Sequence, residues 1–180
     1  MTHPRQGYGG QALLARWRVS LGFVFAAMVV WLATPSPRSL MIGAAIAVIG
    51  ESIRVWAAGH LEKSKEVTQS GPYRYTRHPL YLGSSIIGIG IAVVSDNMVV
   101  YQIIFVYLVL FLVAAIRSEE AHLREKFGDA YDAYAERRAE PMVRQFSWGR
   151  AVGNREHHTI VGLLSGLLLL AGKMILAGKL

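Results

Sequence analysis

The sequence contains no cysteine, and this absence excludes several kinds of chemistry at once. Without cysteine there are no disulfide bonds, no thiolate metal sites and no cysteine nucleophiles. Neither a glycine-rich phosphate loop nor a nucleophile elbow occurs in the sequence. His60 and the pair His157 and His158 lack the spacing with carboxylates that a metal site needs, so no metal site is expected.

Charged residues are also scarce. They make up 17% of the 180 residues, whereas 53% are hydrophobic. The apolar residues form long blocks, which is typical of membrane-spanning helices and not of amphipathic ones. The sequence therefore predicts an all-α, polytopic integral membrane protein with about five transmembrane helices. These are expected at about residues 17–34, 40–58, 79–95, 98–116 and 159–177.

Basic residues predict how these helices are oriented. Most of them lie in the N-terminal arm and in the polar segments 59–78 and 117–158, which share one side if five helices alternate. Lysine and arginine favour the cytoplasmic side, so the N-terminus and both segments are predicted to be cytoplasmic, at the inner or plasma membrane of a prokaryote. Residues 1–11 have no signal-peptide features, so the first helix is expected to be retained.

The net charge of +7 indicates which kinds of partner to expect. The charges flank apolar blocks, which indicates contact with the anionic lipids of the bilayer. Because no nucleic-acid-binding motif accompanies the charge, no nucleic acid partner is expected. The sequence predicts nothing about the oligomeric state.

Residues 71–83 contain the densest group of reactive side chains. The stretch reads GPYRYTRHPLYLG and holds two arginines, one histidine, two prolines and three tyrosines. Pro79 suits the first position of a helix and keeps His78 out of helical geometry. The free N–H groups of the first turn then attract carboxylates or phosphates. The stretch suits a ligand with a carboxylate, a sugar and an aromatic ring, while the alternative is an ordinary membrane-interface belt.

The second polar segment begins with two carboxylates. Glu119 and Glu120 stand at the end of the fourth apolar block, where they either face water or serve a site. An amphipathic helix is expected to follow, with an apolar stripe of Leu123, Phe127, Tyr131 and Tyr134. This helix either lies on the bilayer or caps the site formed by the other segment, and Gly128 is a point where it can break or bend.

Two features lie inside the apolar blocks. Glu51 and Arg54 are three residues apart on one helix face, and they either pair and reach towards the membrane surface or mark a site. The third block is rich in small residues, which favour close helix packing. The alternative is a smooth wall for an acyl or prenyl chain. These small residues are Gly83, Ser84, Ser85, Gly88 and Gly90.

Two motifs together carry a family resemblance. The first is RHPLYLG at residues 77–83, and the second is Glu119–Glu120 followed by FGDAYDAY at residues 127–134. The pattern resembles the isoprenylcysteine carboxyl methyltransferase and phospholipid methyltransferase superfamily, over roughly residues 50–138. The resemblance implies a membrane enzyme that uses S-adenosylmethionine, with a cytoplasmic cofactor pocket closed by the C-terminal segment. It implies a single methyltransferase domain over residues 1–180, with a catalytic core at about 40–150 and an extra helix at 159–177.

The resemblance also points to site residues by position. Cofactor binding is expected for the residues of the first motif, for the stretch before it and for one carboxylate after it. These are Lys65, Glu66, Val67, Thr68, Tyr73, Arg77, His78, Pro79, Leu80, Tyr81, Gly83 and Glu119. The candidate catalytic residues are Arg117, to hold a substrate anion, and Glu120 or His78, to take a proton from an amine acceptor.

The sequence departs from the eukaryotic prenylcysteine enzymes at two places. Lys65 and Glu66 stand where those enzymes have a histidine and a hydroxyl residue. The position of an arginine that those enzymes use near the substrate carboxylate is Ala115 here, and Arg117 lies about 200° further around the helix. This second departure argues against a carboxylate acceptor.

The expected reaction is methyl transfer from S-adenosylmethionine to a lipid-like or small hydrophobic acceptor. An isoprenylcysteine-like carboxylate and a phospholipid amine are both considered. Two alternatives stay open. One is an NADPH-dependent membrane sterol-type reductase, which needs cations for a 2′-phosphate. The other is a non-enzymatic helical membrane scaffold.

Overall fold

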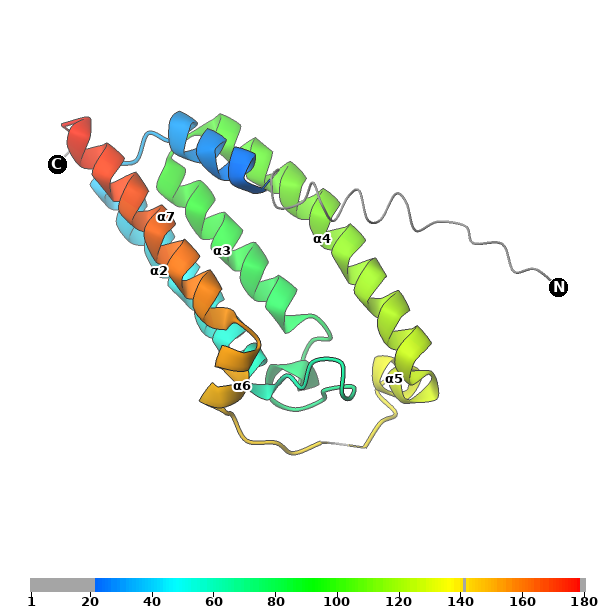
Figure 1. The fold of residues 1–180 in the computed structure, drawn as a ribbon. Coiled ribbons are helices and arrows are strands. Elements are labelled where there is room, and N and C mark those ends of the chain that lie inside the picture. Colours follow the sequence, from blue (N-terminus) through cyan, green and yellow to red (C-terminus); the bar gives the residue numbers. More distant parts are fainter. Residues whose placement is uncertain (1–21, 141, 179–180) are drawn as a thin grey trace.

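The structure is a computed structural model that describes residues 22–140 and 142–178. Every regular element in these residues is helical, which confirms the all-α prediction (Figure 1). A helical stretch at Gly22–Leu32 comes first. The elements that follow are α2 (Pro37–His60), the 3-10 helix η1 (Gly71–Arg74), α3 (Pro79–Ser95), α4 (Met98–Phe127), α5 (Asp129–Ala135), α6 (Trp148–Gly153) and α7 (Glu156–Leu176).

Three of the described helices, α2, α4 and α7, are long and apolar enough to cross a membrane. Their hydrophobic windows are only 28%, 6% and 11% buried inside the protein, so most of their apolar surface faces outwards. Such surface is stable in lipid and not in water. The chain is therefore an integral membrane protein. The helix α3 has 17 residues, and the first expected helix, from about residue 17, begins outside the described residues, so the count of five stays a prediction.

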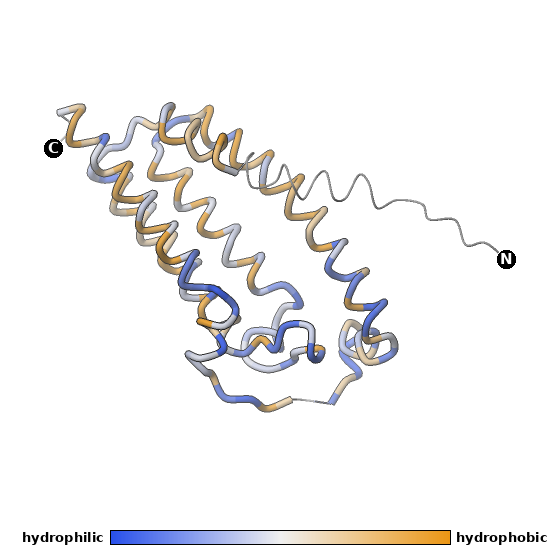
Figure 2. The backbone as a smooth tube through the Cα atoms, in the orientation of Figure 1, coloured by the Kyte–Doolittle hydropathy of each residue, from blue (hydrophilic) through white to orange (hydrophobic). Residues whose placement is uncertain are grey.

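The polar parts of the chain gather at one end of the helices. Figure 2 shows hydrophilic residues concentrated in the loop of residues 61–78, at the end of α4 and in the region before α7. The helices α2 and α4 end there, and α3 and α7 begin there (Figure 1). This common end agrees with the predicted alternation of helices. The cytoplasmic assignment of this end stays a prediction.

Local sequence explains where the helices begin. Ser36 caps α2 through a reciprocal capping box with Ser39, and Pro37 is its first residue. This helix therefore starts three residues before the predicted residue 40, because Pro37 opens it. Pro79 opens α3 as predicted, with His78 outside helical geometry at φ −129° and ψ 56°. The helix α4 runs to Phe127, well past its apolar part, and α6, which Ser147 caps, was not predicted.

Glycines hold α2 and α3 at backbone contact. A Cβ atom on Gly83 would lie 2.6 Å from the carbonyl oxygen of Gly50, and one on Gly90 would lie 2.6 Å from the backbone of Gly43 and Ala47. Only hydrogen fits at these positions, and this permits the close approach that small residues give membrane helices. The packing interpretation of the third apolar block is confirmed for these two glycines. Gly88 instead faces Leu108 on α4.

The helix α7 is part of the same bundle. Leu170 is 1% exposed and packs in one cluster with Ala33 and Val94, which lie at the end far from the loops. At that end the ammonium group of Lys173 donates a 2.8 Å hydrogen bond to the carbonyl oxygen of Val30. The C-terminal end of α7 is thus fixed to the rest of the protein. The start of α7 is fixed as well, by the ion pair of Glu156 with Arg54.

The glycine contacts predict that the same substitution, glycine to alanine, lowers stability on α3 but not on α7. Gly90→Ala forces α2 and α3 apart and is expected to destabilise the protein by about 1–3 kcal/mol. Gly166→Ala on α7 is the matched control, because its Cβ atom meets nothing within 4 Å and alanine favours helix. Thermal unfolding of the full chain in detergent measures both. Equal melting temperatures for the two variants would contradict the packing.

Candidate functional site

A cavity of about 630 Å³ lies at the loop end of the helices. Its size is within the range of about 300–1,000 Å³ typical of small-molecule sites. We call it the loop-end cavity. Its wall comes from α2 to α5, the 61–78 loop and the start of α7. It is lined by Arg54, Leu61, Lys63, Ser64, Glu66, Val67, Thr68, Tyr73, Arg77, His78, Pro79, Leu80, Tyr81, Ala115, Ser118, Glu119, His122, Leu123, Tyr131, Tyr134, Asn154 and Glu156.

The motif of residues 71–83 folds as a short helix, a turn and the start of α3. Gly71 opens η1 with φ +58°, and a Cβ atom there would lie 2.6 Å from the His60 ring. Glycine meets both demands, since it accepts positive φ and has no side chain. The resulting turn buries Tyr73 against the cavity and leaves Tyr75 exposed. The motif is therefore one folded wall of the cavity.

Glu120 joins the two sequence motifs. Its Oε1 atom lies 2.9 Å from Nε2 of His78 and 3.2 Å from Nη1 of Arg77. Glu120 lies in the polar end of α4, beyond the apolar part that ends at Ile116. The hydrogen bond with His78, and next the charge of Arg77, lower the pKa of this carboxyl. The carboxylate is thus ionised at neutral pH and fixes the orientation of the His78 ring.

Arg54 lies where three helices meet at the inner side of the cavity. Its Nε atom is 2.6 Å from Oε1 of Glu156 on α7. Its other nitrogens donate to Ser84 on α3 at 2.5 Å and to Thr159 on α7 at 3.2 Å. Glu51, predicted as its partner, is further away at 4.0 Å. Arg54 therefore ties α2 to α3 and α7 and lines the cavity, so it does more than pair with Glu51.

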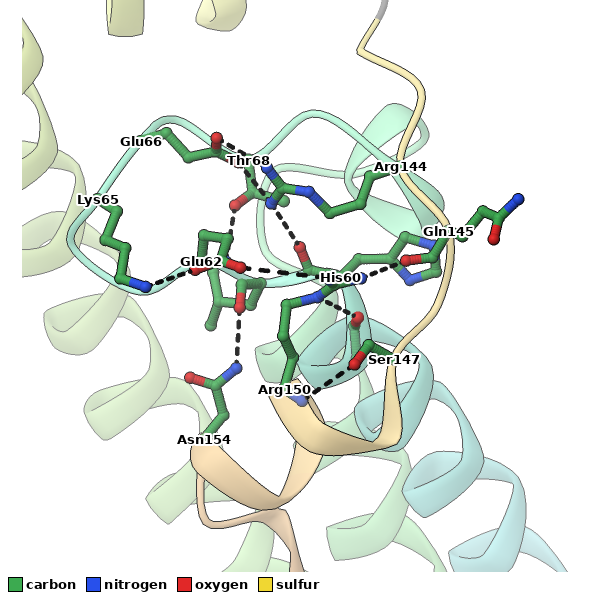
Figure 3. A network of polar contacts seen from close by, with 12 residues as sticks. His60, Glu62, Lys65, Glu66, Thr68, Arg144, Gln145, Ser147, Arg150 and Asn154 are labelled. Carbon is green, nitrogen blue, oxygen red and sulfur yellow. Dashed lines mark hydrogen bonds and ion pairs between the residues drawn. The ribbon is translucent and has the colours of Figure 1, made fainter.

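The chain beyond α5 closes a further side of the cavity. Figure 3 shows the side chains of Arg144 and Asn154 directed at the loop that follows α2. The guanidinium of Arg144 holds both oxygens of Glu66, at 2.6 and 2.8 Å, and this hydrogen bonding raises the pKa of the arginine. The amide of Asn154 donates to the carbonyl oxygens of Ala58 and Leu61, each at 2.9 Å. These bonds hold the cavity wall around Glu66 in place.

The helix α5 covers the cavity from the α4 side. Gly128 separates it from α4 with φ +50° and ψ −126°, so the predicted break is confirmed. Arg124 on α4 lies 2.8 Å from Asp132 on α5 and keeps the two helices together. The hydroxyl of Tyr134 donates to the carbonyl oxygen of Tyr73 at 2.9 Å. Burial raises the pKa of Tyr134 to about 12 and that of Tyr73 further, so both hydroxyls are protonated.

Most of the cofactor residues predicted from the resemblance line this cavity. They are Glu66, Val67, Thr68, Tyr73, Arg77, His78, Pro79, Leu80, Tyr81 and Glu119. Lys65 does not line it, since its ammonium group is exposed and pairs with Glu62 at 3.1 Å. Gly83 packs against α2 instead. The binding roles of all these residues stay predictions.

The candidate catalytic residues are placed differently from one another. His78 lines the cavity, and Glu120 stands behind it as its hydrogen-bond partner. Arg117 is exposed on α4 and is not part of the lining, whereas Ala115 is. This agrees with the helical offset predicted between these two positions. Arg117 as a group that holds substrate has no support from this geometry.

Several lining residues were not predicted as site residues. His122 lies one turn beyond Glu119, and Ser118 lies one turn before His122, so helical spacing gave a signal for both. Arg54 had been recognised as an ionisable residue within a span. No local signal marks Asn154 and Glu156, because they reach the cavity only through the path of the chain after α5.

The geometry defines a membrane protein with a small-molecule-sized cavity, lined by many polar residues, at the loop end of its described helices. The sequence model described as phospholipid methyltransferase matches residues 17–130. This match covers more than half of the chain, and the chain belongs to the phospholipid methyltransferase family.

Three curated relatives resemble the chain in sequence. The nickel-cobalt-cadmium resistance protein NccN of Alcaligenes xylosoxydans xylosoxydans is 29% identical over 67% of this chain and 60% of its own length. The cobalt-zinc-cadmium resistance protein CzcN of Cupriavidus metallidurans is 30% identical over 67% of this chain and 59% of its own. The protein-S-isoprenylcysteine O-methyltransferase of Schizosaccharomyces pombe is 33% identical over 47% of this chain and 36% of its own.

The chain thus spans about 60% of the length of the two bacterial relatives that it matches. No solved structure matches it. The family match ends at residue 130, so the described C-terminal wall from Tyr131 onwards lies outside it.

The lowered pKa of Glu120 predicts a pH-dependent effect of Glu120→Gln. A carboxylate with a lowered pKa adds stability that is complete above the ordinary value of 4.5 and is lost as the pH falls through the folded-state value. The variant is expected to be about 1 kcal/mol less stable than the native protein at pH 7. Denaturant titrations at several pH values should show this gap closing below about pH 4.5. A stability difference that stays constant down to acidic pH would contradict an ionised Glu120 in contact with His78 and Arg77.

The bidentate pair predicts the effect of Arg144→Ala. The substitution leaves the half-buried Glu66 carboxylate without its partner and is expected to cost about 1–3 kcal/mol. It should also raise hydrogen–deuterium exchange in residues 142–148. Arg138→Ala is the control, because the ion pair of Arg138 with Glu136 is exposed. Unchanged exchange in the Arg144 variant would show that the pair does not hold this segment.

Proposed function

We propose that this protein is an integral membrane methyltransferase that moves a methyl group from S-adenosylmethionine to a lipid-like or small hydrophobic acceptor. The observation that supports this most is the convergence of the two sequence motifs on one cavity. The first turn of α3 and Glu119 line it together, although they are about forty residues apart in the chain. Membership of the phospholipid methyltransferase family supports the reaction class.

The residues of the cavity fit S-adenosylmethionine in their chemistry. The start of α3 and the neighbouring Arg77 suit the carboxylate of the donor's amino-acid part. The carboxylate of Glu119 suits ribose hydroxyls, because it can only accept hydrogen bonds. The tyrosine rings suit the flat adenine, and that of Tyr134 is already fixed by the hydrogen bond from its hydroxyl to the backbone carbonyl oxygen of Tyr73. The Tyr131 hydroxyl is a further polar group, and it finds no hydrogen-bond acceptor in the part of the chain that the structure describes.

When bound, S-adenosylmethionine supplies a methyl group on a positively charged sulfur, which is already activated for transfer. The protein then has to orient the donor and exclude water. The helix α5 contributes Tyr131 and Tyr134 to the cavity wall, and Asn154 contributes from the segment before α7. For an amine acceptor, His78 with Glu120 behind it is the pair that can take up a proton.

An apolar surface that suits a hydrophobic acceptor lies near this cavity. A groove of about 510 Å³ runs between α2 and α7 and is lined mainly by aliphatic and aromatic side chains. Its one charged lining residue is Glu51, which adjoins Arg54 and so the cavity. This position supports a lipid-like acceptor over a water-soluble one.

The alternatives have less support. A reductase needs cations for the 2′-phosphate of NADPH, and Lys63 and Arg77 line the cavity. The family match nevertheless supports methyl transfer and not reduction. A passive scaffold needs no polar cavity. Two relatives are named for metal resistance, but residues 22–140 and 142–178 contain no group of three or more histidines and carboxylates that could hold a metal ion. We therefore do not propose a metal site in these residues.

The proposal predicts that His78→Ala and Glu119→Ala weaken S-adenosylmethionine binding at least about tenfold, since each removes a polar group of the cavity. Isothermal titration calorimetry on the full chain in detergent measures this, with NADPH as the competing ligand. Glu125→Ala is the matched control, a glutamate on the same helix end that does not line the cavity. Native affinity in both cavity variants, or binding of NADPH alone, would overturn the proposal.

A further inference from the structure

One hydroxyl in the wall of the loop-end cavity is buried without a partner. Tyr131 on α5 is 1% exposed and is the largest of the fully buried side chains in the described chain. Its hydroxyl makes no hydrogen bond to any of the described residues. Nearly all buried polar groups in native proteins are hydrogen-bonded, and each exception requires an explanation. Since Tyr131 lines the cavity, a ligand in the cavity is the available partner.

The neighbours of Tyr131 are already engaged. Arg77 lies near the hydroxyl, but a guanidinium can only donate, so it cannot accept the proton of the hydroxyl, and it pairs with Glu120 at 3.2 Å. Arg124 lies over the ring, 5.4 Å from its centre, and pairs with Asp132 at 2.8 Å. Burial raises the pKa of Tyr131, and the charge of Glu120 adds to this. The hydroxyl is therefore protonated at neutral pH and can donate a hydrogen bond.

Burial in this wall does not by itself leave a tyrosine unpaired. Tyr134 lies one turn further along α5 and lines the same cavity. Its hydroxyl donates to the carbonyl oxygen of Tyr73 at 2.9 Å, so it is satisfied within the protein. The two tyrosines thus differ in what their hydroxyls contact. The Tyr134 hydroxyl fixes α5 to the motif of residues 71–83, whereas the Tyr131 hydroxyl has no acceptor for its proton among the described residues.

We propose that the Tyr131 hydroxyl donates a hydrogen bond to the methyl donor bound in the loop-end cavity. This makes α5 part of the binding site as well as its cover. The inference rests on the proposed function, because it takes S-adenosylmethionine as the ligand. Both ends of that molecule, the amino-acid carboxylate and the nucleoside, offer acceptor atoms.

The substitution Tyr131→Phe tests this, because it removes only the hydroxyl. Calorimetry with S-adenosylmethionine and thermal unfolding of the ligand-free full chain are measured in parallel. The affinity is expected to fall about tenfold, while the melting temperature of the ligand-free protein stays the same or rises. A hydroxyl with a purely structural role predicts the opposite pair of results, a lower melting temperature with unchanged affinity.

The controls separate the possible failures. Tyr107→Phe, on the apolar part of α4 and outside the cavity lining, should change neither quantity. Tyr131→Met, which also lacks the hydroxyl, replaces the first variant if that one does not accumulate. Native affinity in the Tyr131 variants, beside a wild type that binds the donor, would overturn this inference and leave the proposed function standing. A wild type that does not bind the donor would overturn both.

A second ligand locates the hydrogen bond. 5′-Methylthioadenosine retains the nucleoside but lacks the amino-acid part of S-adenosylmethionine. A similar loss of affinity for both ligands in Tyr131→Phe assigns the bond to the nucleoside. A loss confined to S-adenosylmethionine assigns it to the amino-acid end.

Discussion

The arrangement of the helices depends on the burial of Arg54. A guanidinium inside a membrane helix must find partners, because an unpaired charge in hydrocarbon is costly. Arg54 finds them on the two neighbouring helices, with Glu156 and Thr159 on α7 and Ser84 on α3. These contacts require α2, α3 and α7 to meet at one level of the membrane. The glycine contacts between α2 and α3 bring these two backbones close enough for the arginine to reach Ser84 on α3.

Polar contacts over long sequence distances then complete the cavity. Glu120 at the end of α4 reaches back to His78 at the start of α3, and Arg144 reaches Glu66 in the loop after α2. In both cases a carboxylate on one segment pairs with a basic side chain on a distant segment. Each pair holds part of the cavity wall in place. The cover supplied by α5 is held in the same way, by Arg124 with Asp132 and by Tyr134 with Tyr73. The walls of the cavity are therefore held by pairs that satisfy one another, whereas the Tyr131 hydroxyl finds no acceptor among the described residues.

The chemistry of the first wall could be predicted because it depends on neighbours in sequence. Pro79 fixes the start of α3 through its own geometry, and Gly128 ends α4 because it adopts a positive φ. Glu119 and His122 share a helix face by spacing alone. By contrast, Tyr131 was interpreted as part of an apolar stripe. Spacing shows which face a tyrosine occupies, but it does not show whether its hydroxyl finds a partner.

The sequence by itself determined the helical class, the membrane location of the apolar blocks and the two motifs of the phospholipid methyltransferase family. These properties follow from local composition and spacing, which are independent of how the helices pack. Only the tertiary structure decided that Arg54 lines the cavity, that Lys65 and Arg117 do not, and that Asn154 and Glu156 complete its wall. The physical reason is that these placements depend on the position of α7 and of the segment before it. Buried charges and amides on distant parts of the chain set that position, and no local pattern encodes their pairing.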